Sequence, residues 1–503
     1  RKQKRDALGR MTEVVEDPSG LNYGTTYTYD PLDNLRQVDQ GAQTRTFSYS
    51  SLGRLTSATN PESGVTTYQY YDSGDLKKKT DARGVLSEMT YDALHRILTK
   101  TYSDTTPDVQ YQYHLAGSSA SPNIGQLKSV TSSAASTEYL SYSPLGQITC
   151  TRDTISGFEG YPTFNYDWYL NGAVKSVYYP SGRRVSYDVD DAGRTTKASV
   201  PGKTYMDLIQ YAPDGRLTES KLGNNIWETR EFLPPGSPTT YSFGTSAGAG
   251  NVLQLEYNYS AAANNGNLLS QTMIRPGGAW QQTFTYDGVN RLATAMETGG
   301  WSRTYGYDRY GNRWVAVSNN LAYSEALEPL SQSEFNESTN RMIKTGVNYD
   351  TVGNQTGYDG FTLGYDAENR NTAIGGNGAS GAYAYDGNGR RVKKVWTPSG
   401  QASQTTFYVY DALGRLAAEY SSEVPSSTGA VYPLTDMLGS VRAVASESGQ
   451  VTECYDYLPF GRMLSASDNG RGPLGCFQTD PDTHVDSAIS QKFTSKERDA
   501  ETG

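Results

Sequence analysis

Aspartate carboxyls are the groups in this chain that recur most regularly and could do chemistry. Asp30, Asp92, Asp287 and Asp411 each follow a tyrosine. Two such carboxyls side by side could serve as general acid and base. However, aspartate also opens turns with its side chain, and these residues stand at the same place in successive repeats. We therefore expect them to form turns and not a catalytic pair.

Groups that could bind a metal or attack a substrate are few and scattered. The histidines are His95, His114 and His484, and none has metal-ligand spacing to a cysteine or to another histidine. Residues 480–486 are rich in oxygen ligands but lack the glycine and terminal glutamate of an EF-hand, so we expect a solvated loop. No nucleophile elbow, P-loop or dinucleotide fingerprint occurs in a supporting context. The sequence predicts no catalytic residue, no metal site, no cofactor and no enzyme activity.

The cysteines leave two interpretations open. Cys150, Cys454 and Cys476 are too few for a disulfide framework. Either one pair forms or all three are free thiols, and we expect free, buried or incidental thiols.

The aspartates belong to a repeat whose clearest copy, residues 410–416, has the pattern Tyr-Asp-x-x-Gly-Arg-Leu. Neighbouring tyrosines are spaced near ~20 residues, the lower end of known repeat periods. We expect a structural role for the following repeat positions: Tyr29, Asp30, Tyr49, Gly53, Tyr91, Asp92, Tyr142, Gly146, Tyr211, Gly215, Tyr286, Asp287, Tyr307, Gly311, Tyr349, Gly353, Tyr385, Gly389, Tyr410, Asp411 and Gly414.

Each repeat has the pattern of a β-hairpin. Residues 25–29 and 44–49 alternate aromatic and polar side chains with a period of two, which is typical of a strand. The Asp-x-x-Gly that follows suits a type I turn ending in a left-handed residue. Where glycine is absent, Asp33, His95 or Asn290 occupies that position, and these residue types tolerate positive φ best. The sequence predicts an all-β fold of antiparallel hairpins forming one spiralling sheet.

Composition narrows the function. The chain has 40 Tyr but 12 Phe. Because the tyrosine side chain has an apolar ring and a polar hydroxyl, a sheet lined with tyrosine can face a wet cavity. Its net charge of -10 argues against nucleic acid as the main partner, which would require a basic face. No apolar run approaches the ~18 residues of a membrane span.

The repeat pattern also suggests how the chain is organised. We expect one repeat region, residues 1–464, with irregular loops near 117–125, 223–256 and 318–339. Residues 465–503 are expected to be loop followed by the start of a further segment. Because residues 6–10 already match the second half of a repeat, we expect the chain to begin within the array.

These repeats resemble the YD repeats of Rhs proteins. Residues 436–442 and 455–461 are similar to the Rhs core signature, and residues 493–503 resemble the start of the conserved end of that core. The residues that carry the core signature are Asp436, Gly439, Arg442, Tyr455, Asp456, Pro459, Phe460 and Gly461.

The resemblance implies a large hollow β-shell, as in the C subunit of insecticidal toxin complexes and in teneurins. It further implies a non-enzymatic bacterial protein, secreted or on the cell surface, that encloses a C-terminal polypeptide toxin absent from this chain. The alternative is a teneurin-like adhesion or glycan-binding module that contacts a surface receptor. Aromatic residues of the long loops, such as Tyr241 and Phe243, would then carry binding. The chain ends before the Ala-Arg-Tyr-Tyr stretch and the self-cleavage site of the family.

Overall fold

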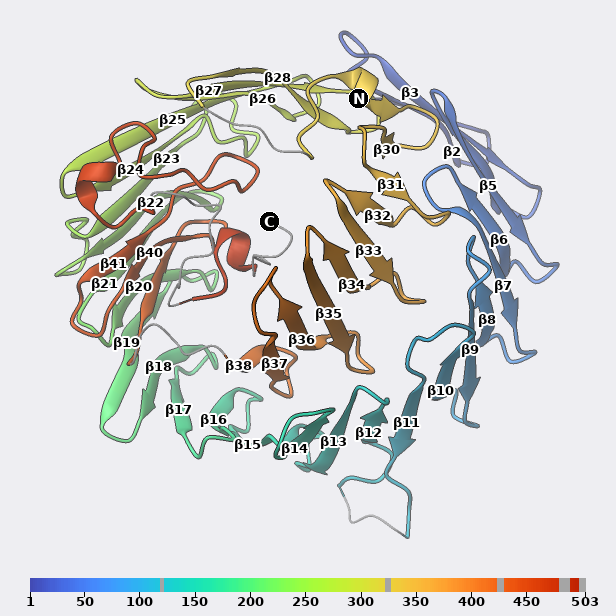
Figure 1. The fold of residues 1–503 in the computed structure, drawn as a ribbon, viewed down its shortest axis with the longest axis horizontal. Coiled ribbons are helices and arrows are strands. Elements are labelled where there is room, and N and C mark those ends of the chain that lie inside the picture. The colour runs from blue at the N-terminus through green and yellow to red at the C-terminus, as the bar shows by residue number, and fades with distance from the viewer. Residues whose placement is uncertain (118–121, 322–326, 423–428, 479–488, 497–503) are drawn as a thin grey trace. The chain divides into compact units, whose positions relative to one another are not determined.

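The computed structural model describes residues 1–117, 122–321, 327–422, 429–478 and 489–496 of the chain. The chain divides into two compact units. Figure 1 labels the strands of both. Unit 1 comprises Arg1–Phe164, Gly306–Ala316 and Ser324–Glu423. Unit 2 comprises Asn165–Tyr305, Val317–Tyr323 and Val424–Gly503.

The predicted all-β fold is confirmed, because the described residues form antiparallel strands with short 3₁₀ turns and no α-helix. Strands β1 to β28 belong to a sheet of 28 strands. Its first part consists of β1 (Lys2–Arg5), β2 (Met11–Glu16), β3 (Tyr23–Tyr29), β4 (Leu35–Gln40), β5 (Gln43–Tyr49), β6 (Leu55–Asn60), β7 (Gly64–Tyr70), β8 (Leu76–Thr80), β9 (Leu86–Tyr91), β10 (Ile97–Tyr102), β11 (Val109–Tyr113), β12 (Leu127–Thr131), β13 (Ala135–Tyr142) and β14 (Ile148–Ile155). Its second part consists of β15 (Thr163–Trp168), β16 (Val174–Tyr178), β17 (Arg184–Val189), β18 (Thr195–Val200), β19 (Lys203–Tyr211), β20 (Leu217–Leu222), β21 (Trp227–Leu233), β22 (Ser237–Gly244), β23 (Leu253–Asn258), β24 (Ser270–Arg275), β25 (Gly278–Tyr286), β26 (Leu292–Glu297), β27 (Ser302–Tyr307) and β28 (Arg313–Asn319).

The remaining strands form three smaller sheets. The two-stranded sheet consists of β29 (Phe335–Asn336) and β30 (Arg341–Met342). The eight-stranded sheet of unit 1 consists of β31 (Asn348–Tyr349), β32 (Gln355–Tyr358), β33 (Phe361–Tyr365), β34 (Asn371–Gly376), β35 (Ala379–Tyr385), β36 (Arg391–Thr397), β37 (Gln404–Tyr410) and β38 (Leu416–Ser421). The three-stranded sheet of unit 2 consists of β39 (Tyr432–Thr435), β40 (Val441–Ala445) and β41 (Val451–Cys454). The 3₁₀ turns are η1 (Gln332–Glu334), η2 (Gly472–Leu474) and η3 (Phe493–Ser495).

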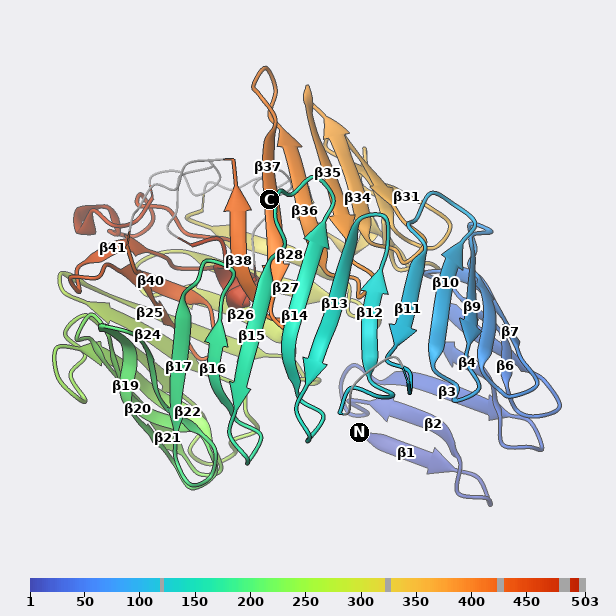
Figure 2. The same ribbon diagram turned by 90° about the horizontal axis from the view of Figure 1, so that it is seen from below.

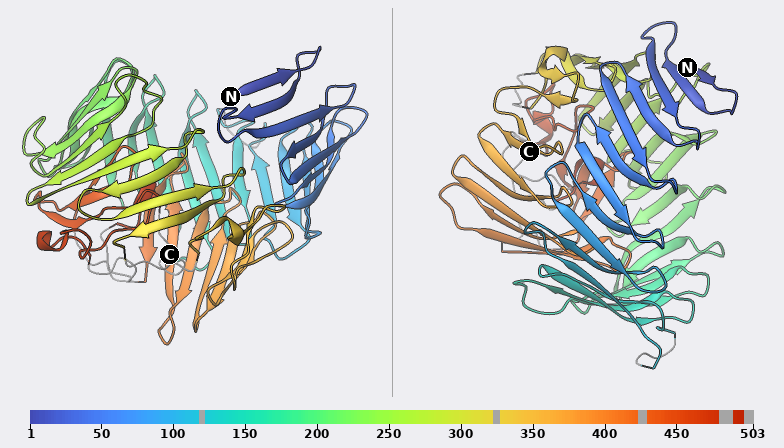
Figure 3. Two further views of the ribbon diagram at one scale, coloured as in Figure 1. Left: turned by 90° about the horizontal axis from the view of Figure 1, so that it is seen from above. Right: turned by 90° about the vertical axis from the view of Figure 1, so that its right-hand side faces the viewer.

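Neighbours in sequence are neighbours in the sheet. Each strand pairs antiparallel with the next within β1–β5 (Figure 2). The same pairing continues to β14 and recurs from β15 to β27. At the end of β3 the register shifts between Thr28 and Tyr29, which is a β-bulge, before the chain turns into β4. The left-handed position of the turn is filled as predicted: φ is +64° at Asp33, +61° at His95 and +65° at Asn290. The two views in Figure 3 show the same hairpin pattern.

In unit 1, hairpin tips of the eight-stranded sheet pack onto strands of the large sheet. The Ala367 N–H donates to Thr106 Oγ1 at 2.8 Å, and Ala367 is buried. At the next tip, a Cβ on Gly387 would lie 2.5 Å from Val130 Cγ1 and 2.7 Å from Val109 Cγ1. Ala367 and Gly387, which follow the aspartates of these two turns, are small residues that fit the covered tips.

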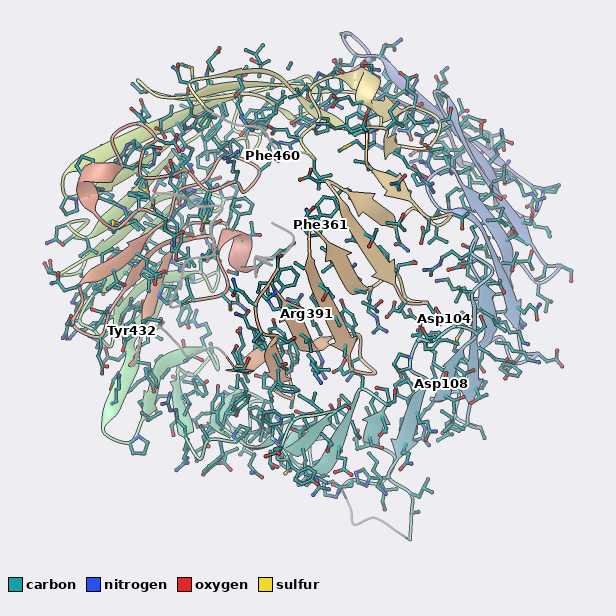
Figure 4. The ribbon with its side chains drawn as sticks, viewed as in Figure 1. Asp104, Asp108, Phe361, Arg391, Tyr432 and Phe460 are labelled. Carbon is teal, nitrogen blue, oxygen red and sulfur yellow. A yellow bond between two sulfur atoms is a disulfide. The ribbon has the colours of Figure 1, made fainter. Side chains whose placement is uncertain are left out.

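In unit 2, the three-stranded sheet packs on β20–β25 through an apolar core. Leu253, Leu255 and Tyr257 alternate along β23, so they share one strand face. They belong to the same buried cluster as Tyr432 and Leu434 of β39. Figure 4 labels Tyr432 on this strand.

Two expectations about residues 223–256 are wrong. This segment contains β21, β22 and the start of β23, and so is not an irregular loop. Tyr241 and Phe243 lie on β22 and are only 6% and 1% exposed, so they cannot form an aromatic binding surface. Their burial follows from their place in the apolar core beneath β39.

The other expected irregular segments differ in outcome. Residues 117–125 lie partly outside the described residues, and the described part is turn. The described part of 318–339, which was expected to be an irregular loop, contains the end of β28, then η1 and β29. Within 465–490, η2 and short bridges are present, whereas residues 479–488, including His484 and the oxygen-rich segment, lie outside the described residues.

Candidate functional site: repeat turns and a buried ion-pair cluster

The repeat tyrosines share one structural position. Each is the last residue of its strand; these residues are Tyr29, Tyr49, Tyr91, Tyr142, Tyr211, Tyr286, Tyr307, Tyr349, Tyr385 and Tyr410. In several copies the hydroxyl donates to the first residue of the preceding hairpin's return strand. Tyr385 Oη donates to the Asn371 carbonyl at 2.6 Å, and Tyr410 Oη to the Arg391 carbonyl at 2.9 Å. Each tyrosine therefore ties its hairpin to the one before it.

The arginine of one repeat covers the tyrosine of the next. The Arg370 guanidinium lies 4.8 Å from the Tyr385 ring centroid, and Arg390 lies 5.0 Å from that of Tyr410. Such cation–π contacts add about 0.5–1 kcal/mol at exposed sites. The coupling is between nearest neighbours, as expected of a repeat array.

The repeat aspartates close their own turns. Asp411 Oδ1 accepts the N–H groups of Leu413 and Arg415, each at 2.9 Å, and Asp411 Oδ2 accepts Arg415 Nε at 2.9 Å. Asp92 makes the same set of bonds, as does Asp287; in Asp30, Asn34 replaces the arginine. The arginine contact, with the two N–H donors, lowers the pKa of Asp92.

The glycines of the repeat take the left-handed conformation that the turn requires. All have φ between +72° and +94°: Gly53, Gly146, Gly215, Gly311, Gly353, Gly389 and Gly414.

The core-signature residues lie together in unit 2. Asp436 and Gly439 form the turn between β39 and β40, and Arg442 lies on β40. Tyr455 and Asp456 follow β41 and are 2% and 1% exposed.

The second turn of the signature contains Pro459, Phe460 and Gly461. The Leu458 N–H donates to the Arg462 carbonyl, and the Gly461 N–H to that of Leu458. Phe460, labelled in Figure 4, is half exposed and meets the Tyr305 ring edge-on, 5.1 Å between centroids.

Three signature residues start a buried ion-pair cluster. Arg442 Nε donates to Asp436 Oδ2 at 2.9 Å, and Arg442 Nη1 pairs with Asp456 Oδ1. All three side chains are nearly excluded from solvent. A buried charge requires such a partner, because desolvation of an unpaired ion is costly.

Arg471 and Glu297 extend this cluster to β26. Arg471 Nη2 pairs with Asp456 Oδ2 and lies 2.6 Å from Glu297 Oε2, and Arg471 Nη1 lies 3.0 Å from Glu297 Oε1. Asn469 Nδ2 also donates to Glu297 Oε1, at 2.7 Å. The segment that follows the signature is thereby fixed to the large sheet.

The charges of the cluster support one another. Burial alone would raise the pKa of Asp456, but Arg471 and Arg442 together lower it. Burial likewise opposes protonation of Arg442, but Asp436 and Asp456 raise its pKa. Asp456 and Arg442 therefore stay ionised at neutral pH.

Two members of the cluster were not predicted. Glu297 ends one strand of an ordinary repeat hairpin, and Arg471 lies in a segment expected to be loop. Neither residue belongs to a local motif, because Arg471 is 174 residues from Glu297 and 15 residues from Asp456. An isolated Arg in a Gly/Asp/Ser-rich segment was the only signal available.

The expectation of three free thiols is also wrong. Cys454 and Cys476 form a disulfide, and Cys150 is free. The pairing joins β41 to the segment that contains Arg471. Cysteines 22 residues apart in a chain with one further cysteine give no sequence evidence for a pair.

Chemically, the cluster can hold the C-terminal segment in place. Its carboxylates are matched by arginines and fully desolvated, unlike a carboxylate that must exchange protons with a substrate. Among the described residues, no three His, Cys, Asp or Glu side chains gather as a metal-binding group. No helix in the described part of the chain is long and apolar enough to cross a membrane.

Sequence comparison relates this chain to two families of repeats. Residues 240–484 match the teneurin YD-shell family and residues 70–107 match the RHS repeat. The double-stranded DNA deaminase toxin A of Burkholderia cenocepacia (strain H111) is 36% identical over 72 residues, 14% of this chain and 5% of that protein. The tRNA3(Ser)-specific nuclease WapA of Bacillus spizizenii is 26% identical over 189 residues, 37% of this chain and 7% of that protein.

Solved structures share the fold over nearly the whole chain. The crystal structure of TcdB2-TccC3-Cdc42 has a TM-score of 0.79 at 16% identity, covering 98% of this chain and 29% of that one. TcdB2-TccC3 without its hypervariable C-terminal region gives 0.78 at 15% identity, with the same coverage. The Photorhabdus luminescens Tc holotoxin pore gives 0.77 at 14% identity, covering 98% of this chain and 28% of that one. The chain thus spans less than a third of these structures and a small part of the curated relatives.

Proposed function

This chain belongs to the Rhs/YD-repeat family, and from that premise we propose that it is a non-enzymatic β-shell that encloses a C-terminal polypeptide. The enclosed polypeptide is a toxin, and the shell serves its secretion or contact-dependent delivery by a bacterium. Enclosure acts by keeping proteases and partners away from the cargo.

The observation that carries the proposal is the fixed position of the C-terminal segment. Ser495 Oγ donates to the Gly439 carbonyl at 2.8 Å, and the Thr494 N–H to Ser440 Oγ at 3.2 Å. These contacts hold the segment beside β40, where Phe493 packs against a buried cluster that includes Val441, Val444 and Tyr457. Any polypeptide on the C-terminal side of this segment follows a part of the chain that is fixed at residues 493–495.

The related proteins support the same proposal. The names of the two curated relatives describe a deaminase toxin and a nuclease, whereas the matched segments are 5% and 7% of those proteins. A solved relative is described as TcdB2-TccC3 without its hypervariable C-terminal region. We infer that the enzymatic activity of such proteins lies outside the part that this chain matches.

Protease protection tests the proposal. A reporter polypeptide is fused after residue 503, and in a matched control the same reporter is fused before residue 1. Under native conditions we expect the C-terminal reporter to survive a protease that removes the N-terminal reporter. Equal digestion of both reporters would show that the chain does not shield a C-terminal cargo.

A further inference from the structure

The disulfide of unit 2 joins two parts of the chain that differ in how they are held. Cys454 ends β41 and is 2% exposed. Cys476 is half-buried and lies in the segment 465–478, which contains η2 and no strand. The bond is therefore a covalent tie between the three-stranded sheet and a segment without a strand of its own.

Non-covalent contacts also hold this segment, among them the hydrogen bond from the Cys454 N–H to the Cys476 carbonyl and the packing of Leu474 against the apolar core. Arg471 pairs with Glu297 and Asp456, and the Asn469 carbonyl accepts a hydrogen bond from Trp280 Nε1 at 2.8 Å. Phe477 forms a single parallel bridge with Cys454 and packs against Trp280. Because the segment lacks a continuous hydrogen-bonded ladder, its position depends on these side chains and on the disulfide.

An arginine lies directly against one sulfur of this bond. Arg275, the last residue of β24, is 6% exposed. Its Nη1 lies 2.6 Å from Cys454 Sγ, and its Nη2 donates to the Arg442 carbonyl. Burial lowers the pKa of Arg275 to about 10, so the guanidinium remains protonated at neutral pH. A fixed positive charge at this distance favours a thiolate at Cys454 over a thiol.

We propose that Cys454–Cys476 is a thiol-reducible latch on segment 465–478, in which Arg275 stabilises Cys454 as the leaving thiolate. The thiolate of a dithiol reductant attacks Cys476 Sγ, the more accessible sulfur. A mixed disulfide forms on Cys476 while the bond to Cys454 breaks, and its electron pair stays on Cys454. The second thiol of the reductant then attacks the reductant sulfur that is bonded to Cys476. This step closes the reductant into a ring and releases Cys476 as a thiolate. The reductant ends as a cyclic disulfide, and the protein gains two electrons and two protons across its two cysteines.

The latch distinguishes oxidising from reducing surroundings. Disulfides persist outside the cell and are reduced in the cytosol by thiol systems. The segment is therefore tied in an oxidising medium and held by non-covalent contacts alone in a reducing one. This inference concerns the segment alone and holds whether or not the chain encloses a cargo.

Trypsin cleavage after Arg471 tests the latch. The full chain carrying Cys150→Ser, which removes the free thiol, is digested oxidised and after treatment with dithiothreitol. We expect cleavage after Arg471, detected by mass spectrometry, to be at least about tenfold faster in the reduced form, because local opening becomes more frequent. Cleavage after Arg183, which is exposed, serves as the internal control and should not change.

Three variants separate the parts of the proposal. Cys476→Ser should be cleaved after Arg471 at the reduced rate with or without dithiothreitol. Arg275→Gln should slow reduction of the disulfide about tenfold, since a leaving thiolate of higher pKa departs more slowly, and Arg275→Lys should restore part of the rate. Thermal melting verifies that the Arg275 variants remain folded. Equal cleavage after Arg471 in oxidised and reduced protein overturns the latch, and an unchanged reduction rate in Arg275→Gln overturns the role of Arg275.

Discussion

Arg471 and Glu297 lie 174 residues apart in sequence and form an ion pair in which neither side chain is exposed to solvent. Two parallel contacts, of 2.6 and 3.0 Å, join the guanidinium to both carboxylate oxygens. The pair connects a segment without strands to β26 of the large sheet. Two contributions therefore hold the C-terminal part of unit 2 in place: this ion pair and the apolar core.

Replacing Arg471 by Met should destabilise unit 2. The substitution leaves the buried Glu297 carboxylate without a positively charged partner and removes one of the two arginines of Asp456. Removing one member of a buried ion pair costs about 3–5 kcal/mol. Urea denaturation followed by tryptophan fluorescence measures the effect. Arg152→Met is the matched control: its pair with Glu138 is about 40% exposed on both sides, so we expect a change below about 1 kcal/mol. A similar decrease in the free energy of unfolding in both variants would show that the buried pair contributes no more to stability than the exposed one.

Tyr385→Phe should weaken the coupling between adjacent hairpins. The ring and its contact with Arg370 remain, while the bond from Oη to the Asn371 carbonyl is lost. We expect a loss of about 1 kcal/mol, the usual net value of a hydrogen bond. Hydrogen exchange should show faster exchange in both β34 and β35. Tyr161→Phe, at a position 69% exposed, is the control, and exchange rates unchanged in both variants would contradict the proposed ladder.

Because of Asp153, the free energy of unfolding of unit 1 should be larger at mildly acidic pH than at neutral pH. Asp153 is 8% exposed on β14 and accepts a hydrogen bond from Thr137 Oγ1 at 2.7 Å; Asp386 and Arg390 face it across a small pocket. Burial raises its pKa to about 6, although Thr137 and Arg390 oppose the shift. Because the folded-state pKa lies above the unfolded value, this contribution is complete below about pH 4 and is lost as pH rises through 6. The difference is about 3 kcal/mol at most.

Asp153→Asn should remove this pH dependence and exceed the wild-type stability above pH 6. Denaturation midpoints from pH 4 to pH 8 measure it. Asp92→Asn is the contrasting control: Arg96 lowers the pKa of Asp92, so its contribution is lost as pH falls below the unfolded value. A wild-type midpoint that does not fall between pH 4 and 7, with Asp153→Asn no different, would contradict the assignment.

Gly387→Ala should disturb the packing of a hairpin tip in unit 1. The added Cβ would lie within 2.7 Å of methyl groups of both Val130 and Val109, so backbone or side chains must shift. Overpacking of this kind costs about 1–3 kcal/mol. Gly24→Ala meets nothing within 4 Å and is the control. We expect a lower thermal midpoint for Gly387→Ala alone, and equal midpoints for the two variants would argue against tight packing at this tip.

The sequence could predict the hairpins because their determinants are local. Tyr410, Asp411 and Gly414 lie within five residues; Asp411 and Gly414 act inside one turn, and Tyr410 bonds to the preceding hairpin. The period of two in β3 likewise depends on neighbouring residues alone. Strand order within a sheet follows, since successive strands pair, as β3 does with β4 and β35 with β36.

The ion-pair cluster and the disulfide could not be predicted in the same way. Asp436, Arg442 and Asp456 were identified as a signature, but their burial against Glu297 depends on packing between distant segments. Tyr241 and Phe243 show the same limitation. Their strand is buried because it packs against β39, which lies about 190 residues later in the sequence. In the sequence alone, the proline- and glycine-rich residues that flank this strand indicated a loop.

Electron cryo-microscopy of a chain that carries a further polypeptide after residue 503 is the decisive test of enclosure. We expect a continuous β wall around an interior, with additional density inside that disappears when the chain is cut back to residue 503. A map in which the downstream polypeptide lies outside the wall, or in which the strands enclose no interior, would contradict it.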